Sequence, residues 1–578
     1  MPRTDTYHAA HHAGCPCHLD PAFAALADLG AMSADPLPRR PAWTDRPLAV
    51  PTVADTILTG RIVTMSAATP VVESIAVSDG RITAVGTRDD VDGLRGPDTD
   101  VIELGDHVAY PGFVEPHMHY WASAMFLGWA DVSTRSGRTY DEVLDILRRT
   151  EPTDGWILAR LYDPALVDGE RDLHRDDLDR IHPDTPVFVI NASMHWAYVN
   201  SAALAAAGIT DDVDQPQGGE YVKHDGRLTG AVGEIAAMAP FMRLLPRKDR
   251  AQLEDAIVDI NRRAASHGYT RTHDAATGGL FGPDEPTLMY GLRDRLDGRV
   301  SFAVLDQVAR RVIEGGMRSG DGDDMARLVH WKIVGDGSNQ GYSGFQHENY
   351  LGKDHRGQPN YSTEYLADSI RTGHEHGFPM MIHANGDASI SQTLDAYEMA
   401  LDGRSGLERR DRIEHCSYPV AADLQRMADL GISPSFLIGH VYYWGHAFRD
   451  NIMGADKAAR LDPLASAVAL GLRASLHCDY TVTEFEPMRE LQTAVTRELR
   501  HDGSVLGPDE RVSVEQALRM KTVDAAWQVH ADDEGVLEPG RFADITVLDR
   551  DPLAVDPGDI ADIGVVRTVV GGRTVYEG

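Results

Sequence analysis

The chain contains little cysteine and no long apolar segment. Its 578 residues include only 4 cysteines, which excludes the disulfide framework of a small secreted domain. No segment approaches the roughly 20 consecutive apolar residues that a membrane-spanning helix needs. The N-terminal stretch MPRTDTYHAAHHAGCPCHLD also lacks the apolar core of a signal peptide. We therefore expect a cytoplasmic protein that has no membrane partner.

Positive charge is also scarce, because 55 basic residues face 89 acidic ones and the formal net charge is −34. This balance argues against a nucleic-acid partner, since nucleic acids bind to basic surfaces. Arginine carries nearly all of the positive charge, so a lysine inside an apolar strand is unusual in this sequence. The chain has six lysines: Lys223, Lys248, Lys332, Lys353, Lys457 and Lys521.

The remaining composition, 42% hydrophobic and 25% charged, is that of a globular protein. In the middle of the chain, short apolar segments alternate with helical stretches, which is typical of a parallel α/β fold. Eight such segments predict eight parallel strands, the number that closes a (β/α)8 barrel of the TIM type. The predicted strands are 109–115, 269–273, 300–304, 329–334, 379–383, 411–415, 432–436 and 473–478.

Both ends of the chain have short β segments separated by turn signals. We predict that residues 53–110 and 530–578 together form a small β-sandwich, although they are far apart in sequence. Residues 111–529 are predicted to form the barrel, with an insertion at 120–262, a segment too long for one crossover. Residues 1–52 are rich in His, Pro and Asp and are predicted to be a partly disordered extension.

The motif PGFVEPHMH (111–119) closes the first predicted barrel strand. In an extended chain, residues i and i+2 point to the same side, so His117 and His119 can reach one metal ion. Such a pair also arises by chance in a chain with 25 histidines. Other ligands must therefore fall at matching positions before the pair indicates a metal site.

Catalytic groups in a (β/α)8 barrel lie at the C-terminal ends of the strands. The fourth predicted strand carries Lys332, and the fifth ends in His383. The sixth ends in His415, and the eighth leads into Asp479. Each residue alone is more easily explained as a satisfied core side chain or, for Asp479, as a helix cap. Their joint occurrence at strand ends on one face favours a metal site.

These motifs resemble those of the amidohydrolase superfamily, and within it the YtcJ-like group that includes N-substituted formamide deformylases. The resemblance extends over roughly residues 53–578. It rests on PGFVEPHMH, GYTRTHDA (268–275), WKIVGDGSNQGY (331–342), IHANGD (382–387), RIEHC (412–416) and LHCDYTV (476–482).

The resemblance implies two divalent metal ions, with Zn²⁺ as the favoured metal for imidazole and carboxylate ligands. His117 and His119 would bind the more buried ion, and His383 and His415 the more exposed one. Lys332 would be carboxylated and would bridge both ions. Such an adduct forms from a neutral amine, and desolvation lowers the pKa of a lysine toward that state.

The resemblance further implies that Asp479 binds the buried ion and acts as general acid and base. The expected reaction is hydrolysis of a non-peptide C–N bond, in an amide, an N-substituted formamide or a related compound, by hydroxide generated at the metal. Two departures from the common family pattern are visible. Glu115 replaces the usual Asp before the histidine pair, and the loop after Lys332 contains Gln340 in a Gln-Gly-Tyr sequence closer to the formamide deformylase branch.

Weaker candidates for the substrate pocket lie in the insertion and after the seventh strand. His195 resembles a family residue that faces the site and would be a catalytic residue that orients a carbonyl, or it is a loop histidine packed beside Trp196. Glu234 matches a family motif, but a solvated residue at a helix start explains it equally well. The segment FLIGHVYYWGHAFRD (436–450) offers His440, Tyr442 and Trp444 either as a pocket wall or as helix core.

Two other functions remain open. A mononuclear deaminase of the same superfamily would not need Lys332, and a non-catalytic barrel scaffold would not need the ligands at all. We expect a small-molecule substrate and a possible homodimer. The extension 1–52 has a soft-metal cluster with no partner cysteine nearby, so a disordered tail is favoured there. The cluster comprises His8, His11, His12, Cys15, Cys17 and His18.

Overall fold

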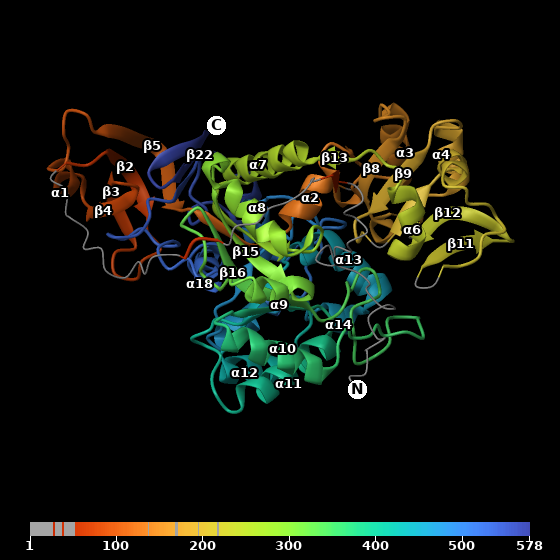
Figure 1. The fold of residues 1–578 in the computed structure, drawn as a ribbon. Coiled ribbons are helices and arrows are strands. Elements are labelled where there is room, and N and C mark those ends of the chain that lie inside the picture. Colours follow the sequence, from red (N-terminus) through yellow and green to blue (C-terminus); the bar gives the residue numbers. More distant parts are fainter. Residues whose placement is uncertain are drawn as a thin grey trace.

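The computed structural model describes residues 27–28, 37–39, 53–136, 138–167, 171–194, 196–216 and 219–578. It has three parts, a central barrel, a β domain on one side and an α/β insertion on the other (Figure 1). The predicted extension 1–52, with its cysteine and histidine cluster, falls almost wholly outside the described residues. Within it, the short strand β1 (Ala27–Asp28) pairs in parallel with β13 (Lys248–Asp249).

The central part confirms the predicted (β/α)8 barrel. Eight parallel strands follow one another in chain order around the sheet, from β6 through β14 and β15 to β20. Backbone hydrogen bonds from His119 N to Tyr480 O and from Asp479 N to His117 O, 3.0 and 3.1 Å long, bring the first and last strand ends together. The strands are β6 (Phe113–Met118), β14 (Tyr269–Thr277), β15 (Arg299–Leu305), β16 (Ala326–Val334), β17 (Met380–Ala384), β18 (Arg412–His415), β19 (Ser433–Phe436) and β20 (Ser475–Leu476).

The first and last strands differ from the predicted bounds. The predicted strand 109–115 joins the end of β5 (Asp100–Pro111) to the start of β6, and the chain changes sheets at Gly112. A Cβ at Gly112 would lie 2.0 Å from Thr270 Oγ1, so only glycine allows this close crossing. The last strand, predicted as 473–478, is regular only over Ser475–Leu476, and the chain turns shortly after it, at Asp479 with φ of 53°.

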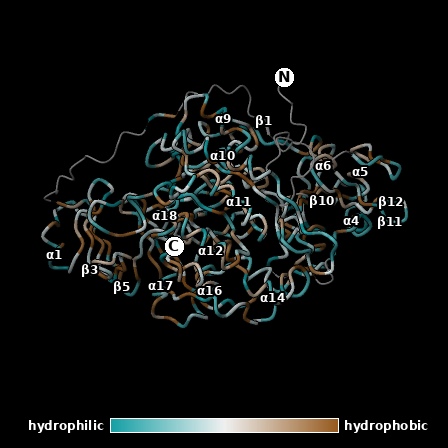
Figure 2. The backbone as a smooth tube through the Cα atoms, turned by 90° about the horizontal axis from the view of Figure 1, so that it is seen from below, coloured by the Kyte–Doolittle hydropathy of each residue, from teal (hydrophilic) through white to brown (hydrophobic). Residues whose placement is uncertain are grey.

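Helices that follow the strands cover the outside of the barrel. Their ends follow local rules, as Ser362 caps α10 and Gly431 closes α12 in the left-handed conformation. Figure 2 shows hydrophobic and hydrophilic stretches alternating along the chain. The covering helices include α7 (Arg250–Ser266), α8 (Glu285–Gly291), α9 (Asp306–Glu314), α10 (Thr363–Glu375), α11 (Asp387–Leu401), α12 (Ala421–Leu430), α15 (Leu464–Ala469), α16 (Pro487–Thr496), α17 (Val514–Lys521) and α18 (Val523–Gln528).

The β domain is built from both ends of the described chain. Its seven-stranded sheet has the order β23-β22-β21-β5-β2-β3-β4, and the two halves meet where β5 pairs antiparallel with β21. Ile62 and Ile75 from the first half pack with Leu537 and Ile545 from the second in one buried cluster. The other strands are β2 (Thr56–Val63), β3 (Val71–Ser78), β4 (Arg81–Gly86), β21 (Ile545–Leu548), β22 (Val565–Val570) and β23 (Arg573–Glu577), with the short helix α1 (Arg88–Asp92) after β4.

The insertion lies between β6 and β14 and has its own six-stranded sheet, in the order β11-β12-β10-β9-β8-β7. Its core is a separate hydrophobic cluster that includes Val143, Leu178 and Val189. The elements are α2 (Tyr120–Phe126), β7 (Ala130–Asp131), α3 (Tyr140–Arg149), β8 (Ile157–Tyr162), α4 (Arg175–Ile181), β9 (Val187–Asn191), β10 (Trp196–Val199), α5 (Ser201–Ala206), β11 (Glu220–His224), β12 (Arg227–Gly233) and α6 (Glu234–Met242).

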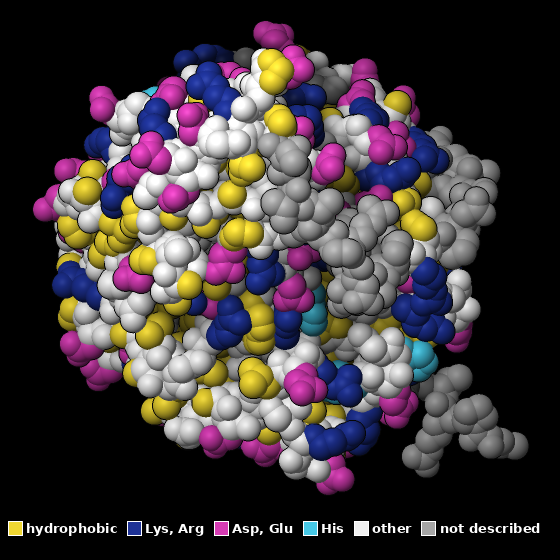
Figure 3. Space-filling view, turned by 90° about the vertical axis from the view of Figure 1, so that its left-hand side faces the viewer, with side chains coloured by type: hydrophobic (Ala, Val, Ile, Leu, Met, Phe, Trp, Pro, Cys, Tyr) yellow, Lys and Arg dark blue, Asp and Glu magenta, His cyan; other side chains and the backbone are white. Residues whose placement is uncertain are grey.

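The face nearest the β domain carries acidic and basic side chains interspersed with scattered hydrophobic ones (Figure 3).

Among the described residues, no helix is both long enough and apolar enough to cross a membrane.

Buried ion pairs join the β domain to the barrel. Arg271 of β14 lies 2.7 Å from Glu534, and Arg299 of β15 lies 2.7 Å from Asp544. All four side chains are at most 5% exposed. Because removing one partner leaves the other charge buried and uncompensated, each pair constrains how the two parts dock.

We therefore expect Arg271→Ala to lower the free energy of unfolding by about 3–5 kcal/mol, because Glu534 would lose its nearest cation. The exposed Arg262→Ala, which breaks the surface pair with Asp259, serves as the control and should change it by less than about 1 kcal/mol. Urea unfolding followed by circular dichroism measures both. Equal effects of the two substitutions would contradict a joining role for Arg271.

Candidate metal centre

Three of the predicted ligands converge where β6 and β20 end. His119 Nε2 lies 2.9 Å from Asp479 Oδ1, and His117 Nε2 lies 3.5 Å from the same oxygen. All three side chains are buried, and their ligand atoms lie within 4.8 Å of one another. The His-x-His spacing at the end of an extended strand places both rings on the side that Asp479 reaches from the neighbouring strand.

These atoms are close but are not hydrogen-bonded to each other. Both ring nitrogens of His119 and Oδ1 of Asp479 are buried and have no hydrogen-bond partner. Buried polar atoms are normally satisfied, so the unsatisfied Nε2 of His119 and Oδ1 of Asp479, which face one another, require a further group. Imidazole and carboxylate are ligands that suit Zn²⁺ and related divalent ions. The residues therefore fit a metal ion at this position.

The orientation of His117 is fixed by a residue that the sequence reasoning did not select. Glu414 Oε2 lies 2.5 Å from His117 Nδ1, and Arg412 Nε lies 2.8 Å from the other Glu414 oxygen. Burial raises the pKa of Glu414, while the positive charges of Arg412 and Lys332 act in the opposite direction. A carboxylate at Nδ1 favours the tautomer that leaves a lone pair on Nε2, as in many metal-binding histidines.

Lys332 lies beside this group, at the interior of β16. Its Nζ is 3.5 Å from His117 Nε2, and the side chain is fully buried. Burial lowers the pKa of Lys332 to about 8, although the charges of Glu414 and Asp479 raise it. The neutral amine, the form that can react with CO₂, is therefore more populated near physiological pH than for an ordinary lysine.

A second group contains His415 together with His477, which the sequence reasoning did not select. His477 Nε2 lies 3.1 Å from His415 Nδ1, and His477 Nδ1 lies 2.9 Å from Ser435 Oγ. The ring of His477 also stacks on His117 with centroids 4.8 Å apart. His415 Nε2 is buried without a hydrogen-bond partner. His477 thus orients His415 and leaves its second nitrogen available.

His383 lies next to this second group but does not converge with it. Its ring centroid is 4.4 Å from that of His415. However, His383 Nε2 lies 3.1 Å from Gly337 O and 3.0 Å from Asn385 Nδ2. The predicted pair of His383 and His415 is therefore adjacent, with one nitrogen of His383 engaged by the loop after β16.

The backbone is strained at two of these residues. His415 has φ of 63° and Asp479 has φ of 53°, in the left-handed region that non-glycine residues rarely adopt. Such conformations persist where surrounding contacts enforce them, and they cluster at functional sites. Both side chains are turned toward the group at a small cost in backbone energy.

A buried ion cluster lies beneath the histidine pair. Lys521 Nζ is 2.9 Å from Glu115 Oε2 and 2.6 Å from Glu490 Oε2. The other Glu115 oxygen accepts hydrogen bonds from the backbone N–H groups of His117 and Cys478, each 3.2 Å long. The glutamate that departs from the common family pattern thus holds both ligand-bearing segments.

The weaker pocket candidates fall at different places. His195 lies outside the described residues. Glu234 begins α6 and is half-buried. Gln340 is half-buried in the loop after β16, where its Oε1 is buried without a hydrogen-bond partner.

The aromatic segment after β19 forms the π-helix η7 (His440–Trp444), a conformation frequent at functional sites. His440 is buried, and burial lowers its pKa to about 4 while the charge of Asp479 acts in the opposite direction. Trp444 is fully buried and donates from Nε1 to Asp163 of the insertion at 2.9 Å. Tyr442 is half-buried and lies under Arg489. Trp444 is therefore a core residue that links the barrel to the insertion.

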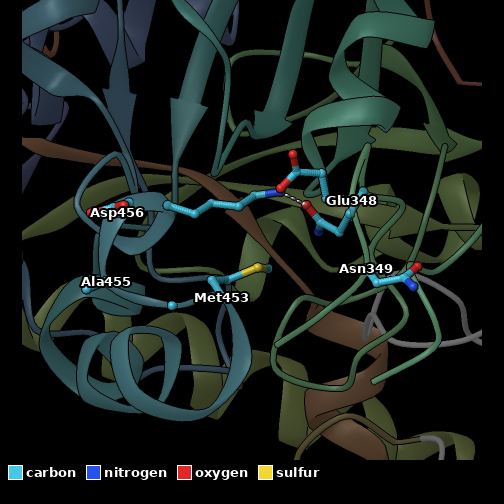
Figure 4. A pocket seen from close by; sticks show the side chains of 8 residues that line it. Glu348, Asn349, Met453, Ala455 and Asp456 are labelled. Atoms are coloured by element: carbon cyan, nitrogen blue, oxygen red, sulfur yellow. Dashed lines mark hydrogen bonds between the residues drawn. The ribbon is translucent and has the colours of Figure 1, made fainter. Parts of the chain in front are cut away.

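The loop after β16 also forms one wall of a separate pocket of about 300 Å³. Figure 4 shows Glu348 and Asn349 on one side of it and Met453, Ala455 and Asp456 on the other. Lys457 connects the two walls by hydrogen bonds. Its Nζ lies 2.8 Å from Gln346 Oε1 and 2.6 Å from Asp387 Oδ2.

Known proteins resemble this chain over nearly its whole length. The Amidohydrolase family model matches residues 100–576. An N-substituted formamide deformylase from Arthrobacter pascens is 30% identical over 90% of this chain and 98% of its own. The putative amidohydrolase YtcJ from Bacillus subtilis is 26% identical over 87% and 96%.

Among solved structures, an uncharacterized metal-dependent hydrolase from Pyrococcus horikoshii has a TM-score of 0.69 at 21% identity, covering 87% of this chain and 99% of its own. At that identity the likeness shows the fold alone. The family model and the deformylase match, together with the barrel, establish that this chain belongs to the amidohydrolase family.

Proposed function

We propose that the chain is a metal-dependent hydrolase that cleaves a non-peptide C–N bond, in an amide or an N-substituted formamide. The observation that carries this proposal is the set of buried, unsatisfied ligand atoms on His119 and Asp479 around which His117 also converges. Such a set of lone pairs is stabilised by a cation. The match to a protein named N-substituted formamide deformylase supports the formamide class.

In this proposal His117, His119 and Asp479 hold one divalent ion. His415 and His383 would hold a second, for which His383 offers the ring nitrogen other than the Nε2 that contacts Gly337 O. Carboxylated Lys332 would bridge the two. The proposed metal is Zn²⁺, on the basis of the imidazole and carboxylate donors.

A metal ion held here would act as a Lewis acid that lowers the pKa of water to about 7 and polarises a carbonyl oxygen. The protein supplies the proton transfers. Asp479 Oδ1 faces the histidine pair, while Oδ2 lies 4.0 Å from His415 Nδ1. We assign Oδ2 to take a proton from the attacking water and to return it to the leaving nitrogen. Glu414 keeps His117 in one tautomer throughout.

A mononuclear deaminase is the second candidate. The engagement of His383 with Gly337 and Asn385 favours it, because that contact leaves fewer groups for a second ion. The low pKa of buried Lys332 favours the binuclear site instead, since a neutral amine can be carboxylated. A non-catalytic scaffold is the least supported function. A scaffold would not need the ligand residues, whereas this chain has all of the expected ones.

Asp479→Asn should retain metal but lose about 10²–10⁴-fold in kcat, because the amide cannot accept the proton. Turnover of a C–N substrate, measured on protein whose metal content has been verified, provides the test. Asp402→Asn is a matched control, since Asp402 is also left-handed, with φ of 48°, but is exposed at the end of α11. Near-wild-type turnover of Asp479→Asn would refute the assigned role.

Lys332→Ala distinguishes the two metal stoichiometries. For a binuclear site, elemental analysis should find about two metal ions per chain in the unsubstituted protein and at least one fewer after Lys332→Ala, because the bridge is lost. The exposed Lys353→Ala should change nothing. One tight ion per chain, unaffected by Lys332→Ala, would instead establish the mononuclear alternative.

A hydrolysis screen of N-substituted formamides, N-acyl amines, ureas and lactones tests the bond that is cleaved. We expect formamides or amides to be the best substrates, and a chelator to abolish turnover that added Zn²⁺ restores. A lactone that is hydrolysed faster than every C–N substrate would contradict the proposed class.

A further inference from the structure

The loop that leaves β16 lies directly on His383. The backbone N of Gly335, which follows the last residue of β16, donates a hydrogen bond to His383 O at 2.9 Å. A Cβ at Gly335 would lie 2.8 Å from that oxygen, so a glycine allows the two segments to approach this closely. The strand that carries Lys332 and the strand that carries His383 are therefore held together at the end where the candidate ligands lie.

Asp336, the next residue of this loop, is fully buried, and its carboxylate accepts three backbone hydrogen bonds. Its Oδ1 accepts from Asn385 N at 2.9 Å, and its Oδ2 accepts from Gly386 N at 2.9 Å and from Phe345 N at 2.8 Å. Hydrogen bonds to an ionised carboxylate are roughly twice as strong as those between neutral groups. Asp336 therefore fixes the turn after β17 against the loop after β16.

The same carboxylate faces the ring of His383. Asp336 Oδ1 lies 3.4 Å from His383 Nε2, and Gly337 O lies 3.1 Å from the same nitrogen. One donor competes with these two acceptors, because Asn385 Nδ2 lies 3.0 Å from Nε2. That amide also donates to Gly337 O at 3.0 Å. The two acceptors outweigh the donor because one of them is charged, so the proton belongs on Nε2 and the lone pair on Nδ1.

The other candidate ligand histidines are held in a comparable way. Glu414 contacts Nδ1 of His117, and His477 contacts Nδ1 of His415. For His383 the nitrogen that the protein engages is Nε2, and Nδ1 remains for a metal ion. Groups that hold the nitrogen remote from the metal fix the ring orientation of the ligand, and their loss typically weakens metal binding 10–100-fold.

We propose that Asp336 is a positioning residue for His383, through which it sets the affinity of the second metal ion without affecting the first. The inference rests on the proposed binuclear site and adds a residue on which one half of that site depends. Among the described residues, the hydrogen bonds and the ion pair of the Asp336 carboxylate involve none of the ligands of the first ion, His117, His119 and Asp479.

Titration of Co²⁺ into the full-length protein, stripped of metal by a chelator, follows both sites through the visible absorption of the bound ion. Asp336→Asn should weaken binding of the second Co²⁺ about 10–100-fold and that of the first by less than about twofold. Both affinities should stay within about twofold in the control, Asp411→Asn. Asp411 is also fully buried, lies 2.7 Å from His374 Nε2 and accepts the backbone N–H of Met380, at the opposite end of β17.

The tautomer of His383 provides a readout that needs no metal. NMR of the metal-free protein with isotope-labelled histidine should show the His383 proton on Nε2, and Asp336→Asn should shift the population toward Nδ1. The signal is identified by its loss in His383→Gln. A general loosening of the fold would not move the proton from one ring nitrogen to the other.

The proposal is overturned if Asp336→Asn leaves the second affinity unchanged, weakens both ions equally or has no more effect than Asp411→Asn. A His383 proton on Nδ1 in the unsubstituted protein overturns it as well. If the unsubstituted protein binds only one Co²⁺ per chain, the binuclear site is rejected, and the tautomer shift alone decides whether Asp336 positions His383. If circular dichroism shows that Asp336→Asn does not fold, the tautomer in the unsubstituted protein decides.

Discussion

The buried cluster of Lys521, Glu115 and Glu490 supports the geometry of the whole candidate centre. Glu115 holds the backbone of His117 on β6 and of Cys478 after β20, while Lys521 and Glu490 come from α17 and α16. The cluster thereby joins the first and last strands of the barrel to two covering helices. Charges this deeply buried are tolerated only as a compensated set, so the set fixes one arrangement of strands.

Two buried lysines in this barrel show how local partners decide protonation. Carboxylates within 3 Å raise the pKa of Lys521 and keep it charged. Lys332 is equally buried, but no described residue forms an ion pair with it, and its pKa falls to about 8. The same low-dielectric interior thus provides a structural cation at the base of the site and an amine that loses its proton more easily at its centre.

The sequence predicted the barrel and the five strands that carry the candidate ligands. This was possible because the position of a residue along a barrel strand determines which face of the barrel its side chain reaches. Glu414 and His477 were missed because their roles depend on contacts between strands, with His117 and His415 respectively. A buried strand that carries Arg412 and Glu414 two residues apart was an available signal. The engagement of His383 by Gly337 could not be foreseen, since it depends on the path of the loop after β16.

The β domain has a consequence for how the protein is made. Strand β5 pairs on one edge with β2 and on the other with β21, which is more than 400 residues later in the chain. During translation the N-terminal strands leave the ribosome first, yet one edge of β5 has no partner until the entire barrel has emerged. An unpaired strand edge is a template for pairing with other chains. A segment near the end of the chain therefore completes the sheet begun at its start, so the edge of β5 stays unpaired while more than 400 of the 578 residues are synthesised.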